Sequence, residues 1–187
     1  MQVSLLLNTI ENRRAYLDYF LEFKKNNNYT VRWAARDSIM ASNILWFAEH
    51  IYPNEKLIIT AHNFHIAKYN EKELTLGEVL FEKYPDEIYA IGVFGGEGEL
   101  ANNSRVPEKL TPPTESNDIK RFVQNSPAQN TFIHIPPTSK KGGEWLYQEV
   151  IVNDSFLDLY GGKTLVPGKS YDGLIFIKKI SPPVFLY

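Results

Sequence analysis

The amino-acid sequence predicts an α/β protein, a layered sheet of mostly parallel strands flanked by helices. Two observations favour this class. Short apolar runs rich in β-branched residues, at 56–61, 87–94 and 174–180, are typical of strands. Longer segments with apolar residues three or four positions apart, typical of helices, alternate with these runs. Alternating strands and helices indicate a sheet that is at least partly parallel.

Two helices are expected at the start of the chain. In residues 10–25, Leu17 and Phe20 belong to a helical apolar spacing, and the polar run Asn26-Asn27-Asn28 ends it. A second helix covers about residues 31–51 and stops before Pro53, because proline cannot continue a helix.

The run Lys56-Leu-Ile-Ile-Thr-Ala61 predicts a central strand that is covered on both faces, because it is apolar without alternation. The strand at 87–94 leads into Gly95-Gly-Glu-Gly-Glu99, which predicts a turn. The other expected elements are a helix at 76–84, a long loop at about 100–115, a short helix at 116–124, a strand at 131–135, an irregular stretch at 136–169 and a strand at 174–180.

Composition narrows the class of protein. With 43% hydrophobic and 22% charged residues in 187, the chain suits one globular domain over residues 1–187. The net charge is −2, and acidic and basic residues are interspersed along the sequence. Such a sequence has no basic patch of the kind that binds nucleic acid or anionic lipid, so neither is expected as a partner. We expect a cytoplasmic protein, since cysteine, a basic leader and an apolar run of roughly 20 residues are all missing from the sequence.

The helix at 31–51 carries polar residues where its pattern calls for apolar ones. Asp37 falls within the apolar stripe that includes Met40, and Arg36 and Asn43 lie along one margin of it. A buried carboxylate needs a partner. Either these side chains form a structural network with a neighbouring loop, or they line a polar cleft and orient a substrate.

His62 and His65 follow the predicted strand at 56–61, where ligands of parallel α/β sheets bind. Imidazole suits proton transfer near neutral pH. Zinc needs three or four ligands, and spacing places no third ligand, so we expect no cofactor and keep a metal site as an alternative. Since the sequence has neither a Gly-x-Ser-x-Gly elbow nor a cysteine, hydrolysis here requires an activated water.

Three motifs in this order resemble the erythromycin esterase family, which includes proteins labelled as succinoglycan-biosynthesis related. They are Arg36-Asp37-Ser-Ile-Met40-Ala-Ser-Asn43-Ile-Leu-Trp46, then Ala61-His62-Asn63-Phe64-His65, then Tyr171-Asp172-Gly-Leu-Ile-Phe-Ile177 with Ser181-Pro182 after it. The similarity runs from about residue 31 to residue 183.

The resemblance implies hydrolysis of a small-molecule ester, in the family's named members the macrolactone ring of a macrolide antibiotic. It implies that the catalytic residues are His62 and His65. The residues that it marks for substrate binding or positioning are Arg36, Asp37, Asn43 and Asn63.

One part of the family pattern is absent from this sequence. The family's earlier half carries a Gly-Glu-x-x-His-Gly motif that supplies the general base, and no such segment occurs in the 187 residues. The resemblance therefore implies the C-terminal half of a larger α/β domain, which needs the missing half in cis or in trans and is a weak or inactive esterase alone. The alternative is an inactive domain that binds a saccharide or polyketide.

Overall fold

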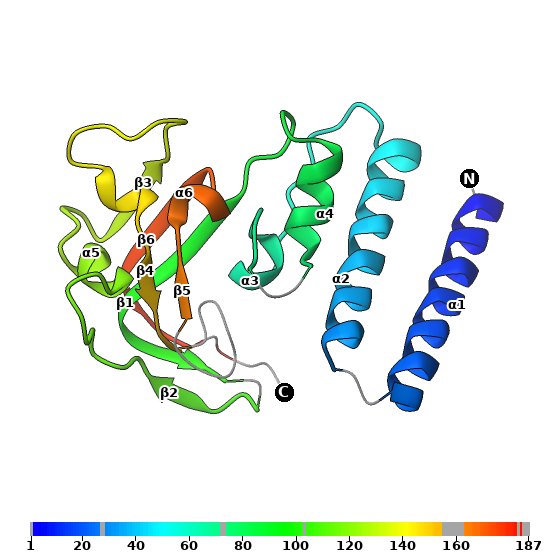
Figure 1. Cartoon of the computed structure of the whole chain (residues 1–187), viewed down its shortest axis with the longest axis horizontal. Helices are drawn as coiled ribbons and strands as arrows, with labels where there is room; N and C mark the ends of the chain where they lie inside the picture. The colour runs from blue at the N-terminus through cyan, green and yellow to red at the C-terminus, as the bar shows by residue number, and fades with distance from the viewer. Residues whose placement is uncertain are drawn as a thin grey trace. The chain divides into compact units, whose positions relative to one another are not determined.

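The computed structural model describes residues 2–26, 29–71, 74–102, 104–154, 163–182 and 184 (Figure 1). The chain divides into two compact units. Unit 1 comprises Met1–Ala61 and Tyr69–Ile88, and unit 2 comprises His62–Lys68 and Tyr89–Tyr187. The expectation of one domain over residues 1–187 stays a prediction.

Unit 1 is helical. It contains α1 (Gln2–Asn26), α2 (Tyr29–Trp46), which continues as one π-helical turn (Phe47–Ile51), and α4 (Leu76–Lys83). Helix α2 packs against both α1 and α4. These elements confirm the three helices predicted there. Within the described residues, no helix has the length and apolar character needed to cross a membrane.

Residues 56–61 form no strand, so the prediction of a central strand is wrong for this chain. The segment belongs to no helix or strand, and Leu57, Ile58 and Ile59 are 40%, 94% and 41% exposed. Among the described residues, no backbone hydrogen bond reaches this segment. A strand exists only where a neighbouring backbone pairs with it, and here the apolar run has no such neighbour.

Unit 2 is built on a four-stranded sheet of order β2-β1-β6-β3. Its strands are β1 (Ile91–Ala101), β2 (Pro107–Lys109), β3 (Asn130–His134) and β6 (Gly173–Ile180). The α/β class is confirmed. The expectation of mostly parallel strands is wrong, because only β1 and β6 are parallel and the other two pairs are antiparallel. The connection from β1 to β2 is too short for a crossover helix, which forces β2 to run back along β1.

The run Gly95-Gly-Glu-Gly-Glu99 is not a turn but the second half of β1, which corrects the sequence-based expectation. Gly98 adopts φ +110°, and a Cβ built there would lie 2.0 Å from the carbonyl oxygen of Ile180 on β6. Glycine is therefore needed for the close approach of two strand backbones rather than for a change of direction.

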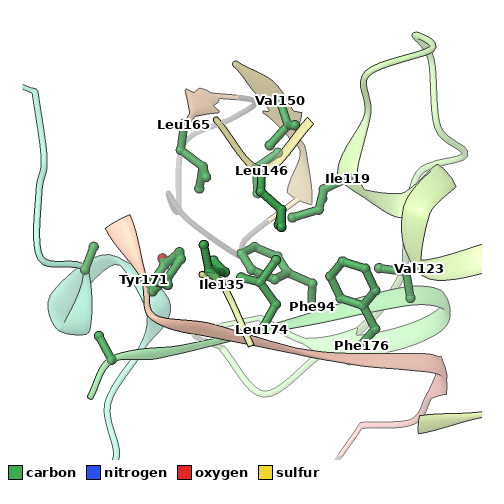
Figure 2. Close-up of a cluster of buried hydrophobic side chains, with 13 residues drawn as sticks. Phe94, Ile119, Val123, Ile135, Leu146, Val150, Leu165, Tyr171, Leu174 and Phe176 are labelled. Carbon is green, nitrogen blue, oxygen red and sulfur yellow. The ribbon is translucent and has the colours of Figure 1, made fainter. Parts of the chain in front are cut away.

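In its described residues, unit 2 also contains six shorter elements. They are α3 (Asn63–Ile66), α5 (Ile119–Gln124), the 3₁₀ turn η2 (Glu144–Tyr147), the strand pair β4 (Val150–Val152) and β5 (Lys163–Leu165), and α6 (Pro167–Ser170). Figure 2 shows the core, in which Phe94 and Phe176 from the sheet lie among apolar side chains of these elements. The labelled members of this core are Phe94, Ile119, Val123, Ile135, Leu146, Val150, Leu165, Tyr171, Leu174 and Phe176.

Tyr171 is the largest fully buried side chain of the described residues. Its ring meets that of Phe94 edge to face with centroids 6.1 Å apart, and its hydroxyl donates a hydrogen bond to the carbonyl oxygen of Asn63 at 3.1 Å. Burial raises the pKa of the Tyr171 hydroxyl well above its ordinary range, because the phenolate is poorly solvated there.

We predict that Tyr171→Phe lowers the free energy of unfolding by about 1 kcal/mol at pH 7, through loss of one buried hydrogen bond. The wild-type protein should also lose stability above pH ~10, because the unfolded tyrosine ionises there while the folded one keeps its proton. The variant should show a weaker fall. Denaturant unfolding between pH 7 and 11 measures both effects. Tyr52→Phe, at an exposed position, is the control and should match the wild type. Parallel curves for Tyr171→Phe and the wild type above pH ~10 would contradict the assignment.

Candidate active site

The two predicted catalytic histidines lie on one short segment of unit 2. His62 is the N-cap of α3, and its Nδ1 accepts a hydrogen bond from the backbone N–H of Phe64 at 3.3 Å. A neutral ring that accepts at Nδ1 carries its proton on Nε2, so the far edge of His62 is a hydrogen-bond donor. The His65 ring lies 6.5 Å from that of His62, centroid to centroid. His62 is exposed and His65 half-buried.

Asn63 fixes the first half of this segment to the sheet. Its buried amide donates from Nδ2 to the carbonyl oxygen of Val93 at 2.7 Å and accepts at Oδ1 from the N–H of Val93 at 2.9 Å. One side chain thereby pairs both backbone groups of a β1 residue, as a neighbouring strand would. Asn63 is thus a positioning residue for the histidines on either side of it.

Lys68 fixes the other end of the segment. Its Nζ forms an ion pair with Oδ1 of Asp172 at 2.5 Å, and both side chains are at least three-quarters buried. The second oxygen of Asp172 accepts from the N–H of Ala90 at 2.9 Å, and the N–H of Lys68 donates to the carbonyl of Ser170 at 2.9 Å. The histidine segment is therefore tied to the residues that precede both β1 and β6.

The network extends through Tyr89 to the end of β3. The Tyr89 hydroxyl donates to the carbonyl oxygen of Asp172 at 2.9 Å and lies 2.6 Å from Nδ1 of His134, whose ring stacks on it. Partial burial, and secondarily the charge of Asp172, raise the pKa of Tyr89. Since the hydroxyl proton goes to the carbonyl, Nδ1 of His134 acts as the donor to the tyrosine oxygen. His134 thereby links the end of β3 to Tyr89.

Asp37 is buried within unit 1, with 1% of its surface exposed. Its Oδ2 accepts from the N–H of Leu76, the first residue of α4, at 3.1 Å, and the guanidinium of Arg36 lies 3.5 Å from its Oδ1. A carboxylate at the start of a helix satisfies an N–H that has no partner within the helix. Of the two alternatives for Asp37, the structural contact with a neighbouring element is present. The other alternative, that Asp37 lines a polar cleft, stays a prediction.

Asn43, half-buried on α2, faces α1. Its Oδ1 accepts hydrogen bonds from the side-chain amides of Asn8, at 3.4 Å, and of Asn12. Arg36, Asp37 and Asn43 thus belong to unit 1, whereas His62, Asn63 and His65 belong to unit 2. The structure groups the predicted site residues within each unit. The hypothesis that the two groups line one cleft stays a prediction.

Within the described part of the chain, no three His, Asp or Glu side chains are grouped so that they could hold a metal ion. That part of the chain therefore supplies no third His, Asp or Glu ligand for a metal ion beside His62 and His65. The expectation of no cofactor and the alternative of a metal site both remain predictions.

Sequence reasoning did not single out Lys68 and Asp172 as site residues. The two are 104 positions apart, so no local spacing links them. The signal that was available is the position of Asp172 directly before an apolar strand. A charged side chain at that point needs a partner, but only the fold shows which one.

We predict that Lys68→Met lowers the free energy of unfolding by roughly 1–3 kcal/mol, because it leaves the mostly buried Asp172 carboxylate without its cation. The amides of Asn63–Ile66 should also exchange faster with deuterium, as the segment loses one of its attachments. Denaturant unfolding and hydrogen–deuterium exchange measure the two effects.

The matched control is Lys83→Met. Lys83 pairs with Glu49 at the surface, where this contact raises the pKa of Lys83 and lowers that of Glu49. Surface ion pairs contribute little to stability, so this variant should unfold like the wild type. Equal effects of the two substitutions would show that the Lys68–Asp172 pair does not hold the segment.

The sequence profile of the family named Erythromycin esterase matches residues 3–180. The Bacillus subtilis (strain 168) protein named "Putative hydrolase YbfO" is 26% identical over 166 residues, which cover 81% of this chain and 36% of YbfO.

Three solved structures share the fold. A protein from Bacillus cereus has a TM-score of 0.67 at 22% identity, covering 81% of this chain and 40% of its own. A succinoglycan biosynthesis protein has a TM-score of 0.68 at 19% identity, covering 82% and 40%. A mutant of the erythromycin esterase EreC, in its open conformation, has a TM-score of 0.56 at 13% identity, covering 80% and 37%.

This chain spans well under half the length of each of these proteins. The family profile nevertheless covers nearly all of its residues, including the three motifs that carry the resemblance up to Ile177. The chain belongs to the erythromycin esterase family.

Proposed function

We propose that this chain supplies one wall of a hydrolytic cleft, in which water attacks the carbonyl of a small-molecule ester of the macrolactone type. Membership of the family and the similarity to a protein named as a hydrolase support a hydrolase. The observation that carries the proposal is the histidine segment itself. It holds His62, the N-cap of α3, and His65, within α3, on a segment anchored through Asn63 and Lys68.

The two histidines have different roles in this proposal. His62 accepts at Nδ1, which places its ring proton on Nε2, and in this proposal that N–H donates to the oxyanion that develops as water attacks the ester. His65 delivers a proton to the departing alkoxide, which is a poor leaving group unless it is protonated. Arg36 and Asn43 contact the substrate or orient the two histidines. Asp37 and Asn63 are positioning residues, since Asp37 joins α2 to the start of α4 and Asn63 joins the histidine segment to β1.

A second polypeptide part completes the site. The general base of the family lies in a Gly-Glu-x-x-His-Gly motif that these 187 residues lack, and this chain spans 36% of YbfO. We propose that the remaining part, in cis or in trans, supplies that base. Since removing one member of a cooperating catalytic set abolishes most of the rate, this chain alone should hydrolyse esters poorly.

The proposal for His65 is tested by the dependence on the leaving group. In the assembled protein, His65→Ala should lower kcat for an alkyl ester by ~10²-fold or more. For a nitrophenyl ester the loss should be much smaller, because nitrophenolate leaves without a proton. Steady-state kinetics with the two esters measure the difference. Equal losses for both esters would remove His65 from the role of acid.

The proposal for His62 is tested by a pair of substitutions. His62→Leu removes the donor and should lower kcat by ~10²–10³-fold, the usual effect of losing one oxyanion donor. His62→Gln keeps an N–H at similar reach and should lose less. Thermal unfolding of both variants controls for the loss of the α3 cap. If glutamine and leucine reduce kcat equally, the donor role is wrong.

Two results would favour the alternatives. An assembled protein that binds a polyketide or saccharide without turning over any ester would support the binding domain. Stoichiometric zinc in the purified protein, lost on His65→Ala, would support metal-dependent hydrolysis. Neither result is compatible with the roles assigned above.

A further inference from the structure

Phe64 lies between the two histidines of the segment and is the one apolar residue among residues 62–65. Other residues form the side of the segment that faces the sheet and the core. Asn63 is buried against β1, Ile66 packs against the core, and Ala67 is 1% exposed. These three positions follow the i, i+3, i+4 spacing of one helix face. Phe64 falls outside that spacing, and neither apolar cluster of the described residues includes it. Its half-buried ring therefore faces away from the core.

Phe64 contacts both histidines, but through different groups. Its ring meets the His65 ring edge to face, with centroids 5.2 Å apart and planes at 86°. Its backbone N–H donates to Nδ1 of His62 at 3.3 Å. Edge-to-face pairs are favoured contacts between rings, so the Phe64 side chain occupies one flank of the His65 imidazole. An apolar surface therefore adjoins the group that delivers the proton in the proposed function.

The position of this surface indicates which part of an ester would contact it. An acid gives up its proton within hydrogen-bond reach, so the departing oxygen lies roughly 3 Å from a ring nitrogen of His65. The carbons of the alcohol portion begin one bond beyond that oxygen. The acyl portion begins at the carbonyl, whose oxyanion the proposed function places at His62. Because the Phe64 ring lies against His65 and only its backbone reaches His62, the geometry favours the alcohol portion.

We propose that Phe64 is a specificity-determining residue whose ring lines a subsite for an apolar alcohol portion of the ester. The inference rests on the proposed function in one respect, since it takes His65 as the acid. Each methylene of the alcohol that packs on the ring leaves water, which strengthens binding by about fourfold. The substrates are thereby narrowed to esters of alkyl alcohols with several carbons, in preference to methyl esters and esters of polar alcohols.

The test uses steady-state kinetics of the assembled protein with two series of esters. One series, from methyl to pentyl acetate, lengthens the alcohol, and the other, from methyl acetate to methyl hexanoate, lengthens the acyl chain. In the wild type, kcat/KM should rise by about fourfold per methylene over the first carbons of the alcohol. In Phe64→Ala the rise should fall below about twofold per methylene, mainly through KM. The dependence on acyl length should be the same in both proteins.

Two substitutions serve as controls. Phe64→Leu keeps an apolar side chain and should retain most of the dependence on alcohol length. Phe132→Ala makes the same truncation on β3, where Phe132 is 56% exposed, and should leave that dependence unchanged. The ring contact itself is checked by proton NMR of this chain alone. Phe64→Ala should shift the ring resonances of His65, because an aromatic ring shifts the protons beside it, and should leave those of His134 in place.

Three outcomes would overturn the inference. An equal loss of kcat for all esters in Phe64→Ala would show that the ring only holds His65. A changed dependence on acyl length instead of alcohol length would place the ring beside the wrong portion. Unshifted His65 resonances in Phe64→Ala would contradict the contact. Hydrolysis whose dependence on alcohol length survives Phe64→Ala contradicts the subsite and leaves the hydrolase standing.

A measurement that needs no turnover separates the opposite case. The probe is 1-butanol, the alcohol that hydrolysis of butyl acetate releases, and nuclear Overhauser contacts between its alkyl protons and the Phe64 ring are recorded in the assembled protein. Such contacts in a protein that hydrolyses none of the esters support the subsite and contradict the hydrolase. A lack of these contacts overturns the subsite, whatever the rate of hydrolysis.

Discussion

Asp172 joins several parts of unit 2 through contacts of both its carboxylate and its backbone. The side chain binds Lys68 and accepts from the N–H of Ala90. The backbone N–H of Asp172 donates to the carbonyl oxygen of Ala90, and its carbonyl oxygen accepts from the Tyr89 hydroxyl and the N–H of Ile135. These contacts bring together the beginnings of β1 and β6, the end of β3 and the histidine segment. A mostly buried carboxylate is stable there because each of its two oxygens accepts a hydrogen bond, one of them from a cation.

This arrangement explains how a four-residue helix can hold reactive side chains in place. An isolated helix of that length is unstable, so α3 depends on its attachments rather than on its own propensity. Asn63 supplies one attachment by pairing with Val93, and Tyr171 adds another from the core by donating to the carbonyl of Asn63. Site residues on a loop are precise only when supporting contacts of this kind lock them.

The two units differ in how much apolar surface they bury. Unit 2 has a continuous core between its sheet and the elements shown in Figure 2. Among the described side chains, the buried apolar cluster of unit 1 consists of Ala41, Leu76 and Leu80, with partly buried neighbours around it. Unit 1 leaves both the 56–60 run and much of α1 exposed. The hydrophobic effect closes unit 2 around its core, whereas apolar side chains of unit 1 stay exposed.

The sequence by itself determined the α/β class, the helices of unit 1, the three paired strands with strong apolar runs and the family, because hydrophobic period and short motifs are local properties. It also marked His62, His65 and Asn63 as one segment. The tertiary structure decided the mixed direction of the sheet, the continuation of β1 through its glycines, and the absence of a strand at 56–61. It also decided the Lys68–Asp172 pair. Each of these features depends on which backbone or charged group lies beside it in the fold. That neighbour can be distant in the sequence, as Lys68 and Asp172 are at 104 positions apart, so a local pattern does not predict it.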